Sequence, residues 1–181
     1  FLLLQKVKLL IIACNTIASV AGEAVQERSP VPVLDVIDAG ASIAAAETRT
    51  KNVGVIGTPA TINSNAYARA IHRYDPDVRI FSQACPLFVP LVEEGWFDHP
   101  ATRLVAEEYL APLRAAGVDT IVLGCTHYPM LSELIGSVLG PEVVRIDSAQ
   151  ETARELASVL AAKGLEAPAG TAVHHRWAAT D

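Results

Sequence analysis

The sequence predicts an α/β protein of two lobes, each a parallel, doubly wound sheet flanked by helices. Short apolar, β-branched segments alternate with helix-like segments along the 181 residues, and this alternation is typical of parallel sheets covered on both faces. Two of the apolar segments end in a cysteine that small polar residues follow, at Cys14 and Cys125. Ligands of parallel sheets bind beyond the carboxyl ends of the strands. The matched pair therefore indicates that each lobe contributes one strand-end cysteine to a shared cleft.

The predicted elements follow from local residue preferences. Runs rich in Val, Ile and Leu are typical of buried strands. They predict strands over residues 9–13, 53–57, 78–82, 118–123 and 143–147, and a strand or an extended link over residues 30–36. The helix-like segments that alternate with these runs are predicted to be helices, over residues 17–27, 39–49, 62–73, 88–94, 100–116, 131–139 and 149–163. Residues 1–8 are expected to be the end of a helix, and nothing regular is expected beyond residue 164. Thr58 and Thr61 are interpreted as helix caps rather than ligand contacts.

Composition and charge argue against several classes of protein. The chain is 51% hydrophobic, with a net charge of −6 and no run of Lys or Arg, so the positive surface that nucleic acid requires is missing. Its apolar start, residues 1–4, is too short to span a bilayer. Cys14, Cys85 and Cys125 form no close-spaced pair, which argues against a zinc ribbon, a thioredoxin motif and a disulfide scaffold. A reducing, cytoplasmic location fits best.

No metal site is predicted from the histidines outside the second cysteine segment. They have no second ligand at metal-binding spacing, and surface or loop positions are expected for them. These residues are His72, His99, His174 and His175.

Cys125 lies at a predicted turn from strand to helix. Gly124 allows a tight turn, Thr126 is a candidate N-cap, and Pro129 fits the first helical turn. The thiol is therefore expected near the positive end of a helix, a position that favours thiolate over thiol. A lone cysteine is more commonly an inert, buried hydrophobic residue. Cys14 stands in a matching setting, however, and two such cysteines favour a chemical role.

Three segments resemble motifs of a known family. Residues 12–16 (Ile-Ala-Cys-Asn-Thr) and residues 124–131 (Gly-Cys-Thr-His-Tyr-Pro-Met-Leu) resemble the two cysteine motifs of glutamate racemases, within the aspartate/glutamate racemase superfamily. Residues 85–93 (Cys-Pro-Leu-Phe-Val-Pro-Leu-Val-Glu) resemble the segment that carries the active-site Glu of that family. The likeness covers nearly the whole chain. The segment around Cys125 is specific enough to indicate glutamate racemases rather than only the superfamily.

The resemblance implies a cofactor-independent interconversion of L- and D-glutamate, which supplies D-glutamate for peptidoglycan and so for cell wall biogenesis and cell shape. Inverting an amino acid calls for a base on each face of the α-carbon, because one base cannot reach both faces without moving substantially. Cys14 and Cys125 are the implied bases. A thiol suits both roles because its reference pKa of about 8.5 lies near working pH. No pyridoxal lysine motif is visible, so no cofactor is expected, and the spacing of the histidines predicts no metal.

The resemblance also implies the other residues of the site. The carboxylate and ammonium groups of the substrate are expected to bind Asn15, Thr16, Thr126 and His127. His127 is expected to assist Cys125, by stabilising its thiolate as an imidazolium or by relaying the proton. Glu93 is favoured over Glu94 as a further acid–base residue. Cys85 is interpreted as structural.

The division into lobes is a further implication of the resemblance. Residues 1–35 with residues 145–181 would be what remains of the first lobe, which carries Cys14, and residues 36–144 would be the second lobe, which carries Cys125. Family members have a further strand and helices before the first cysteine motif, with an Asp, a Ser, a Tyr and a Gly that serve the first cysteine or the substrate. We therefore expect an N-terminally truncated chain with an incomplete first lobe, exposed apolar surface and weak or no activity of its own.

The sequence leaves some alternatives to this function open. A related member of the superfamily, such as an aspartate or hydantoin racemase or a one-cysteine decarboxylase, would share the fold, although the presence of both cysteines disfavours the decarboxylase. A non-catalytic α/β binding domain is another alternative. The expected partner is a small-molecule substrate, glutamate, with no nucleic acid and no membrane. Homodimer formation, allosteric effectors and the direction that each cysteine serves are undecided.

Overall fold

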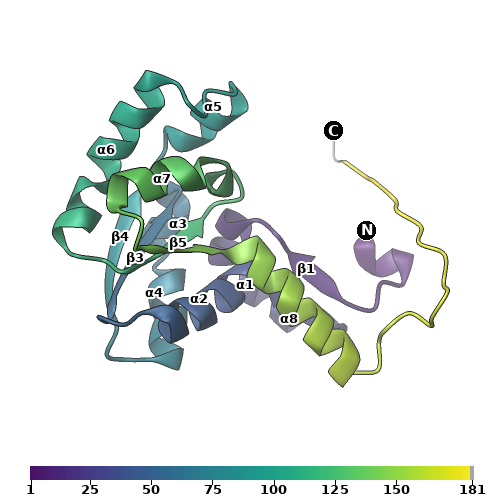
Figure 1. The fold of residues 1–181 in the computed structure, drawn as a ribbon. Coiled ribbons are helices and arrows are strands. Elements are labelled where there is room, and N and C mark those ends of the chain that lie inside the picture. The colour runs from purple at the N-terminus through teal and green to yellow at the C-terminus, as the bar shows by residue number, and fades with distance from the viewer. Residues whose placement is uncertain (180–181) are drawn as a thin grey trace.

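The computed structural model describes residues 1–179, which contain two parallel sheets (Figure 1). The larger sheet has the strand order β4-β3-β5-β6, with β3 (Asn52–Gly57), β4 (Arg79–Ala84), β5 (Thr120–Gly124) and β6 (Val144–Asp147). The smaller sheet pairs β1 (Leu10–Ile12) with β2 (Val33–Asp35). Each strand pair is parallel, as the alternation of strands and helices predicts.

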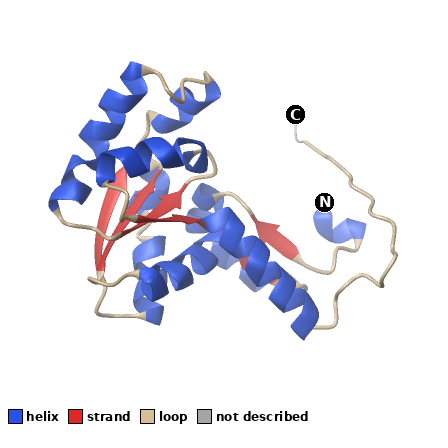
Figure 2. Ribbon diagram, in the orientation of Figure 1, coloured by secondary structure: helices blue, strands red, loops and turns tan. Residues whose placement is uncertain are grey.

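Helices cover both faces of the larger sheet (Figure 1 and Figure 2). They are α1 (Asn15–Arg28), α2 (Val36–Glu47), α3 (Pro59–Asn63), α4 (Ala66–Tyr74), α5 (Phe88–Glu93), α6 (Pro100–Ala115), α7 (Ser132–Leu139) and α8 (Ser148–Ala162), with short 3₁₀ helices η1 (Leu2–Gln5) and η2 (Tyr128–Leu131). The helices α5, α6 and α7 pack on one face, and α2 and α4 pack on the other. Across residues 1–179, no helix combines the length and the apolarity that crossing a bilayer demands.

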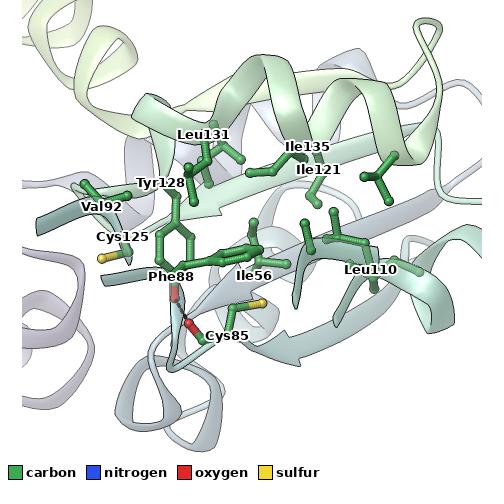
Figure 3. Close-up of a cluster of buried hydrophobic side chains, with 14 of the residues drawn as sticks. Ile56, Cys85, Phe88, Val92, Leu110, Ile121, Cys125, Tyr128, Leu131 and Ile135 are labelled. Atoms are coloured by element: carbon green, nitrogen blue, oxygen red, sulfur yellow. Dashed lines mark hydrogen bonds between the residues drawn. The ribbon is translucent and has the colours of Figure 1, made fainter. Parts of the chain in front are cut away.

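The core on the α6 and α7 side is built around aromatic rings (Figure 3). Phe88 makes edge-to-face contacts with Tyr109 and Tyr128, with ring centroids 5.4 and 5.3 Å apart. The Tyr128 hydroxyl donates a hydrogen bond of 2.8 Å to the Cys85 carbonyl, which satisfies the polar atom of a buried ring. Cys85 is fully buried, and burial raises the pKa of its thiol to about 12. Its surroundings are those of a structural cysteine, as predicted.

The helix predicted over residues 62–73 is two helices in the structure. Asn65 separates α3 from α4, because it adopts a left-handed backbone conformation with φ of 55°, which a right-handed helix cannot contain. The Ser64 hydroxyl accepts a hydrogen bond of 3.1 Å from the N–H of Ala66. The first N–H group of α4 is thereby satisfied without a cap from Asn65.

The segment after β5 differs from the prediction only in its first part. The helix predicted over residues 131–139 is α7, which begins at Ser132, but η2 lies between it and the turn at Cys125. His127, not Thr126, is the residue that precedes η2, and its side chain makes no capping bond. Pro129 lies in the first turn of η2, the kind of position predicted for it. At the start of the chain, η1 is a single 3₁₀ turn rather than the end of an α-helix.

The larger sheet extends across the predicted boundary between the lobes at residues 144 and 145. β6 pairs with β5, so that Ile146 lies opposite Val122 and Asp147 opposite Leu123. The helix that follows β6, α8, packs against α2 and also contacts β2 of the smaller sheet. The division into lobes stays a prediction.

Candidate active site

The strands β3 and β5 end side by side, and the residues that follow them form the candidate site. Both strands end in a glycine, and these two glycines are partners in the parallel ladder. Thr58 and Cys125 therefore leave the same edge of the sheet next to each other. The Thr58 hydroxyl lies 2.9 Å from the Thr16 hydroxyl. Because Thr16 is two residues beyond Cys14, this contact brings the first cysteine segment to the edge that carries the second.

Three threonine hydroxyls meet where the first cysteine segment contacts α3. The Thr16 hydroxyl is 2.9 Å from that of Thr58 and 3.3 Å from that of Thr61, and the last two are 3.0 Å apart. Thr58 also caps α3, as predicted, by accepting a hydrogen bond of 3.2 Å from the N–H of Thr61. The prediction of Thr61 as a cap is wrong, because Thr61 lies inside α3. Sequence reasoning also missed the contact of both residues with Thr16, which joins segments distant in sequence.

Asn15 is the first residue of α1 and is almost completely buried, with 2% of its surface exposed. Its Oδ1 accepts a hydrogen bond of 2.6 Å from the Tyr67 hydroxyl. Its Nδ2 is also buried, and within residues 1–179 it has no hydrogen-bond partner. A buried donor without an acceptor costs about 1–3 kcal/mol. Nδ2 is thus a hydrogen-bond donor that no acceptor of the described residues satisfies.

Cys14 lies between β1 and α1 and is exposed. Its backbone is extended, with φ of −103° and ψ of 120°, and it occupies the N-cap position of α1 without a side-chain capping bond. No side chain of the described residues forms a hydrogen bond with its thiol. The first cysteine therefore has no assisting side chain in this part of the structure.

Cys125 is followed by a histidine that links it to a carboxylate. The Cys125 Sγ is 3.8 Å from Nδ1 of His127, and Nε2 of His127 is 3.1 Å from Oε1 of Glu93 at the end of α5. The Thr126 hydroxyl is 3.5 Å from the same Nδ1. Glu94 forms no ion pair with any described residue. Of the two candidate glutamates, the structure thus brings Glu93 to the imidazole.

Burial raises the pKa of the Cys125 thiol above its ordinary value. The backbone N–H of His127 opposes this increase, as do the hydroxyl and N–H of Thr126, whereas the charge of a Cys14 thiolate adds to it. The expectation that the turn favours thiolate is therefore wrong in its net direction. Only 8% of Cys125 is exposed, and the turn that follows is a short 3₁₀ helix rather than the start of α7.

The histidines outside the second cysteine segment lie away from this site. His72 Nε2 is 2.9 Å from the Val78 carbonyl, and His99 caps the start of α6. His174 and His175 lie in the exposed segment after α8. In the part of the chain that the structure describes, no group of three or more His, Cys, Asp or Glu side chains is arranged to hold a metal ion.

A separate cavity of about 420 Å³ lies between α1, α2 and α4. Its lining includes the charged residues Glu23, Asp38, Arg69 and Arg73. Arg73 donates to the Asp38 carboxylate at 2.6 Å, so part of this charge is already paired. Neither cysteine lines this cavity, which is therefore distinct from the strand-end site.

Comparison with known proteins identifies relatives of this chain. The family model for Asp/Glu/hydantoin racemase matches residues 2–156. A glutamate racemase of Syntrophus aciditrophicus is 61% identical over all 181 residues, which cover 67% of that protein. A glutamate racemase of Geobacter metallireducens is 51% identical with the same coverage. The chain thus spans about two thirds of the length of these curated relatives.

Solved structures of glutamate racemases share the fold. The Francisella tularensis enzyme in complex with D-glutamate has a TM-score of 0.86 at 43% sequence identity, over 93% of this chain and 62% of that one. A Bacillus anthracis isoform has a TM-score of 0.87 at 40% identity, over 92% of this chain and 63% of that one. These relatives are amino-acid racemases, a class of isomerase. The chain belongs to the Asp/Glu/hydantoin racemase family.

Proposed function

We propose that this protein interconverts L- and D-glutamate without a cofactor, with Cys14 and Cys125 as its two acid–base residues. The observation that carries the proposal is the convergence of both cysteine segments on one edge of the larger sheet, through the contact of Thr16 with Thr58. A negative charge on Cys14 raises the pKa of Cys125, and this electrostatic effect, which weakens with distance, also supports the proposal. The choice of glutamate rests on the relatives, which are named glutamate racemases.

The proposed reaction removes one proton from the α-carbon and adds another on the opposite face. One cysteine, as a thiolate, takes the α-proton and becomes a thiol, while the other, as a thiol, protonates the carbanion and becomes a thiolate. Because burial raises the pKa of Cys125, its resting form is the thiol, which is ready to donate. To act as the base it must first lose that proton. We infer that Nδ1 of His127, 3.8 Å from the sulfur, accepts it.

Glu93 would support His127 in this step. Its Oε1 is 3.1 Å from Nε2 of the imidazole, so it stabilises the imidazolium that forms when His127 takes the thiol proton. Glu93 therefore acts on Cys125 through His127 in this proposal, rather than by touching the substrate.

The substrate would bind between the two cysteine segments. Thr16 and Thr126 offer hydroxyl groups to its carboxylate and ammonium groups, and His127 borders the same space. Asn15 offers the Nδ2 donor that has no partner among the described residues. With a net charge of −6, these 181 residues provide no long-range attraction for an acidic amino acid. Affinity for glutamate must then come from these local donors.

The resemblance to glutamate racemases suggests the biological setting. We infer a cytoplasmic enzyme whose D-glutamate is used in peptidoglycan, with residues 1–35 and 145–181 as one lobe and residues 36–144 as the other. Since no described side chain assists Cys14, weak activity is expected of the 181 residues alone. Exposed apolar residues in and after β1 favour self-association, as a homodimer or otherwise; these are Ile11, Ile17 and Val20.

Exchange of the α-hydrogen in deuterated water tests this function. The full-length gene product is incubated with L- or D-glutamate, and deuterium at the α-carbon is followed by NMR together with the enantiomer formed. Each enantiomer should give the other, with one deuterium incorporated. Cys14→Ser and Cys125→Ser should each abolish inversion, while Cys85→Ala, which removes a buried thiol outside the site, should retain it. Inversion that survives the loss of either site cysteine, or glutamate binding without exchange, would refute the proposal.

A further inference from the structure

We propose that Tyr67 is a positioning residue that holds the two cysteine segments in register and orients the Asn15 amide to donate to the substrate. This inference rests on the proposed function and deepens it. Tyr67 lies in the first turn of α4, and only 3% of it is exposed. Its two ends contact different segments of the site.

The hydroxyl of Tyr67 holds the first cysteine segment. It donates a hydrogen bond of 2.6 Å to Oδ1 of Asn15, and the Val36 carbonyl is 3.4 Å away. Asn15 directly follows Cys14, so this hydrogen bond anchors the start of α1 to α4. Burial raises the pKa of the phenol, so the hydroxyl keeps the proton that it donates.

The ring of Tyr67 packs against the second cysteine segment. A Cβ atom added to Gly124 would lie only 3.1 Å from Cε2 of the ring, so the ring packs directly against the backbone before Cys125. On its other edge, a Cβ atom added to Gly40 would lie 3.4 Å from Cε1. Glycine at both positions leaves room for the ring. A single side chain therefore contacts the residue after one cysteine and the residue before the other.

The hydrogen bond from Tyr67 also decides which end of the Asn15 amide faces a ligand. Because the hydroxyl donates to Oδ1, the amide presents Nδ2 on its other side, and this buried donor has no partner among residues 1–179. The reversed amide would present Oδ1, which repels a carboxylate. The observed orientation suits a carboxylate oxygen of the amino acid, whose negative charge grows as the α-carbon loses its proton.

Tyr67→Phe in the full-length gene product removes the hydroxyl and keeps the ring. We expect kcat/KM for racemisation to fall roughly five- to tenfold, the size of one lost hydrogen bond. The factor should be the same for both enantiomers, because the equilibrium constant between mirror images is fixed. Tyr74→Phe is the matched control: Tyr74 lies on the same helix and donates to the Asp38 carboxylate at 2.8 Å, away from both cysteine segments. Its activity should not change.

A double-mutant cycle with Asn15→Ala separates positioning from a general loss of structure. If Tyr67 acts through Asn15, adding Tyr67→Phe to Asn15→Ala should cause little further loss of kcat/KM. The inference is overturned if Tyr67→Phe behaves like Tyr74→Phe, or if its effect is as large without the Asn15 amide as with it. If the unmodified protein does not racemise glutamate, the proposed function fails. Calorimetry with D-glutamate then decides the inference: Tyr67→Phe should weaken binding by a similar factor, and no binding at all overturns both.

Discussion

Glu93 and Glu94 are adjacent in sequence, yet only Glu93 reaches the imidazole of His127. Its Oε1 is 3.1 Å from Nε2 of His127, whereas Glu94 pairs with no cation among the described residues. Replacing either glutamate by glutamine removes one negative charge and keeps the shape of the side chain. Glu93→Gln with Glu94→Gln as its control therefore tests the position of the charge rather than its presence.

The expected effect of Glu93→Gln is modest because the ion pair is partly exposed. The Glu93 side chain is 66% exposed and that of His127 is 32% exposed, and such pairs contribute about 0.2–1 kcal/mol. This stabilisation applies when His127 carries the proton taken from Cys125, so its loss slows the step that needs the Cys125 thiolate. A loss of about 1 kcal/mol corresponds to a roughly fivefold fall in kcat/KM. A fall beyond about 100-fold would indicate instead that Glu93 itself transfers a proton.

Initial rates of inversion of both glutamate enantiomers measure this effect, at low and at high ionic strength. The difference between the unmodified protein and Glu93→Gln should narrow as salt increases, because salt screens a partly exposed pair. Glu94→Gln should match the unmodified protein in both conditions. Equal losses in the two variants, or no loss in Glu93→Gln, would refute the role given to the Glu93 carboxylate.

Two further predictions concern stability and thiol reactivity. Burial raises the pKa of Asp119, but hydrogen bonds from the Thr48 hydroxyl and two backbone N–H groups outweigh it and lower the pKa to about 2. Their contribution to stability is present above the unfolded-state pKa of about 4 and is lost as pH falls toward the folded-state value. Asp119→Asn should therefore lower the free energy of unfolding by about 1 kcal/mol at neutral pH, after allowance for exposure. The urea midpoint of the unmodified protein should fall between about pH 4 and pH 2, and that of the variant should fall less. A variant midpoint that falls as steeply would contradict this. An alkylating reagent should modify exposed Cys14 first, Cys125 later, and buried Cys85 only after unfolding, as followed by peptide mass spectrometry. Early modification of Cys85 would contradict the packing of the core.

The strands of the larger sheet could be predicted because each is a run of apolar residues. β3 and β5 begin and end within two residues of their predicted bounds, and their burial is nearly complete. The break between α3 and α4 could not be predicted, because Ile62 to Arg73 keeps helical spacing through Asn65. One left-handed residue changes the direction of the chain without changing that pattern.

The prediction for the Cys125 pKa was wrong for a different reason. The residues around Cys125 indicate a turn into a helix, and that local pattern favours thiolate. Burial has the larger effect, and it comes from the packing of several elements: Cys125 belongs to the same cluster as Val92 of α5 and Leu131 of η2 (Figure 3). Desolvation by neighbours from several elements has no signature in a short stretch of sequence.

The difference between local sequence patterns and contacts between distant elements also applies to the positions of the two cysteines. Cys125 lies beside the end of β3 because β3 and β5 pair through backbone hydrogen bonds. The apolar runs predict that both segments are strands, but not that they are neighbours. The first cysteine follows β1, and among the described residues β1 belongs to a different sheet. Two side-chain hydrogen bonds bring its segment to the site, one between the hydroxyls of Thr16 and Thr58 and one donated by Tyr67 to Asn15. Contacts of this kind join residues that are distant in sequence, so the motifs predict which residues react, while Thr58 and Tyr67, which lie outside the motifs, help to position the first cysteine segment. Removing a single hydroxyl should therefore alter catalysis even though both cysteines remain.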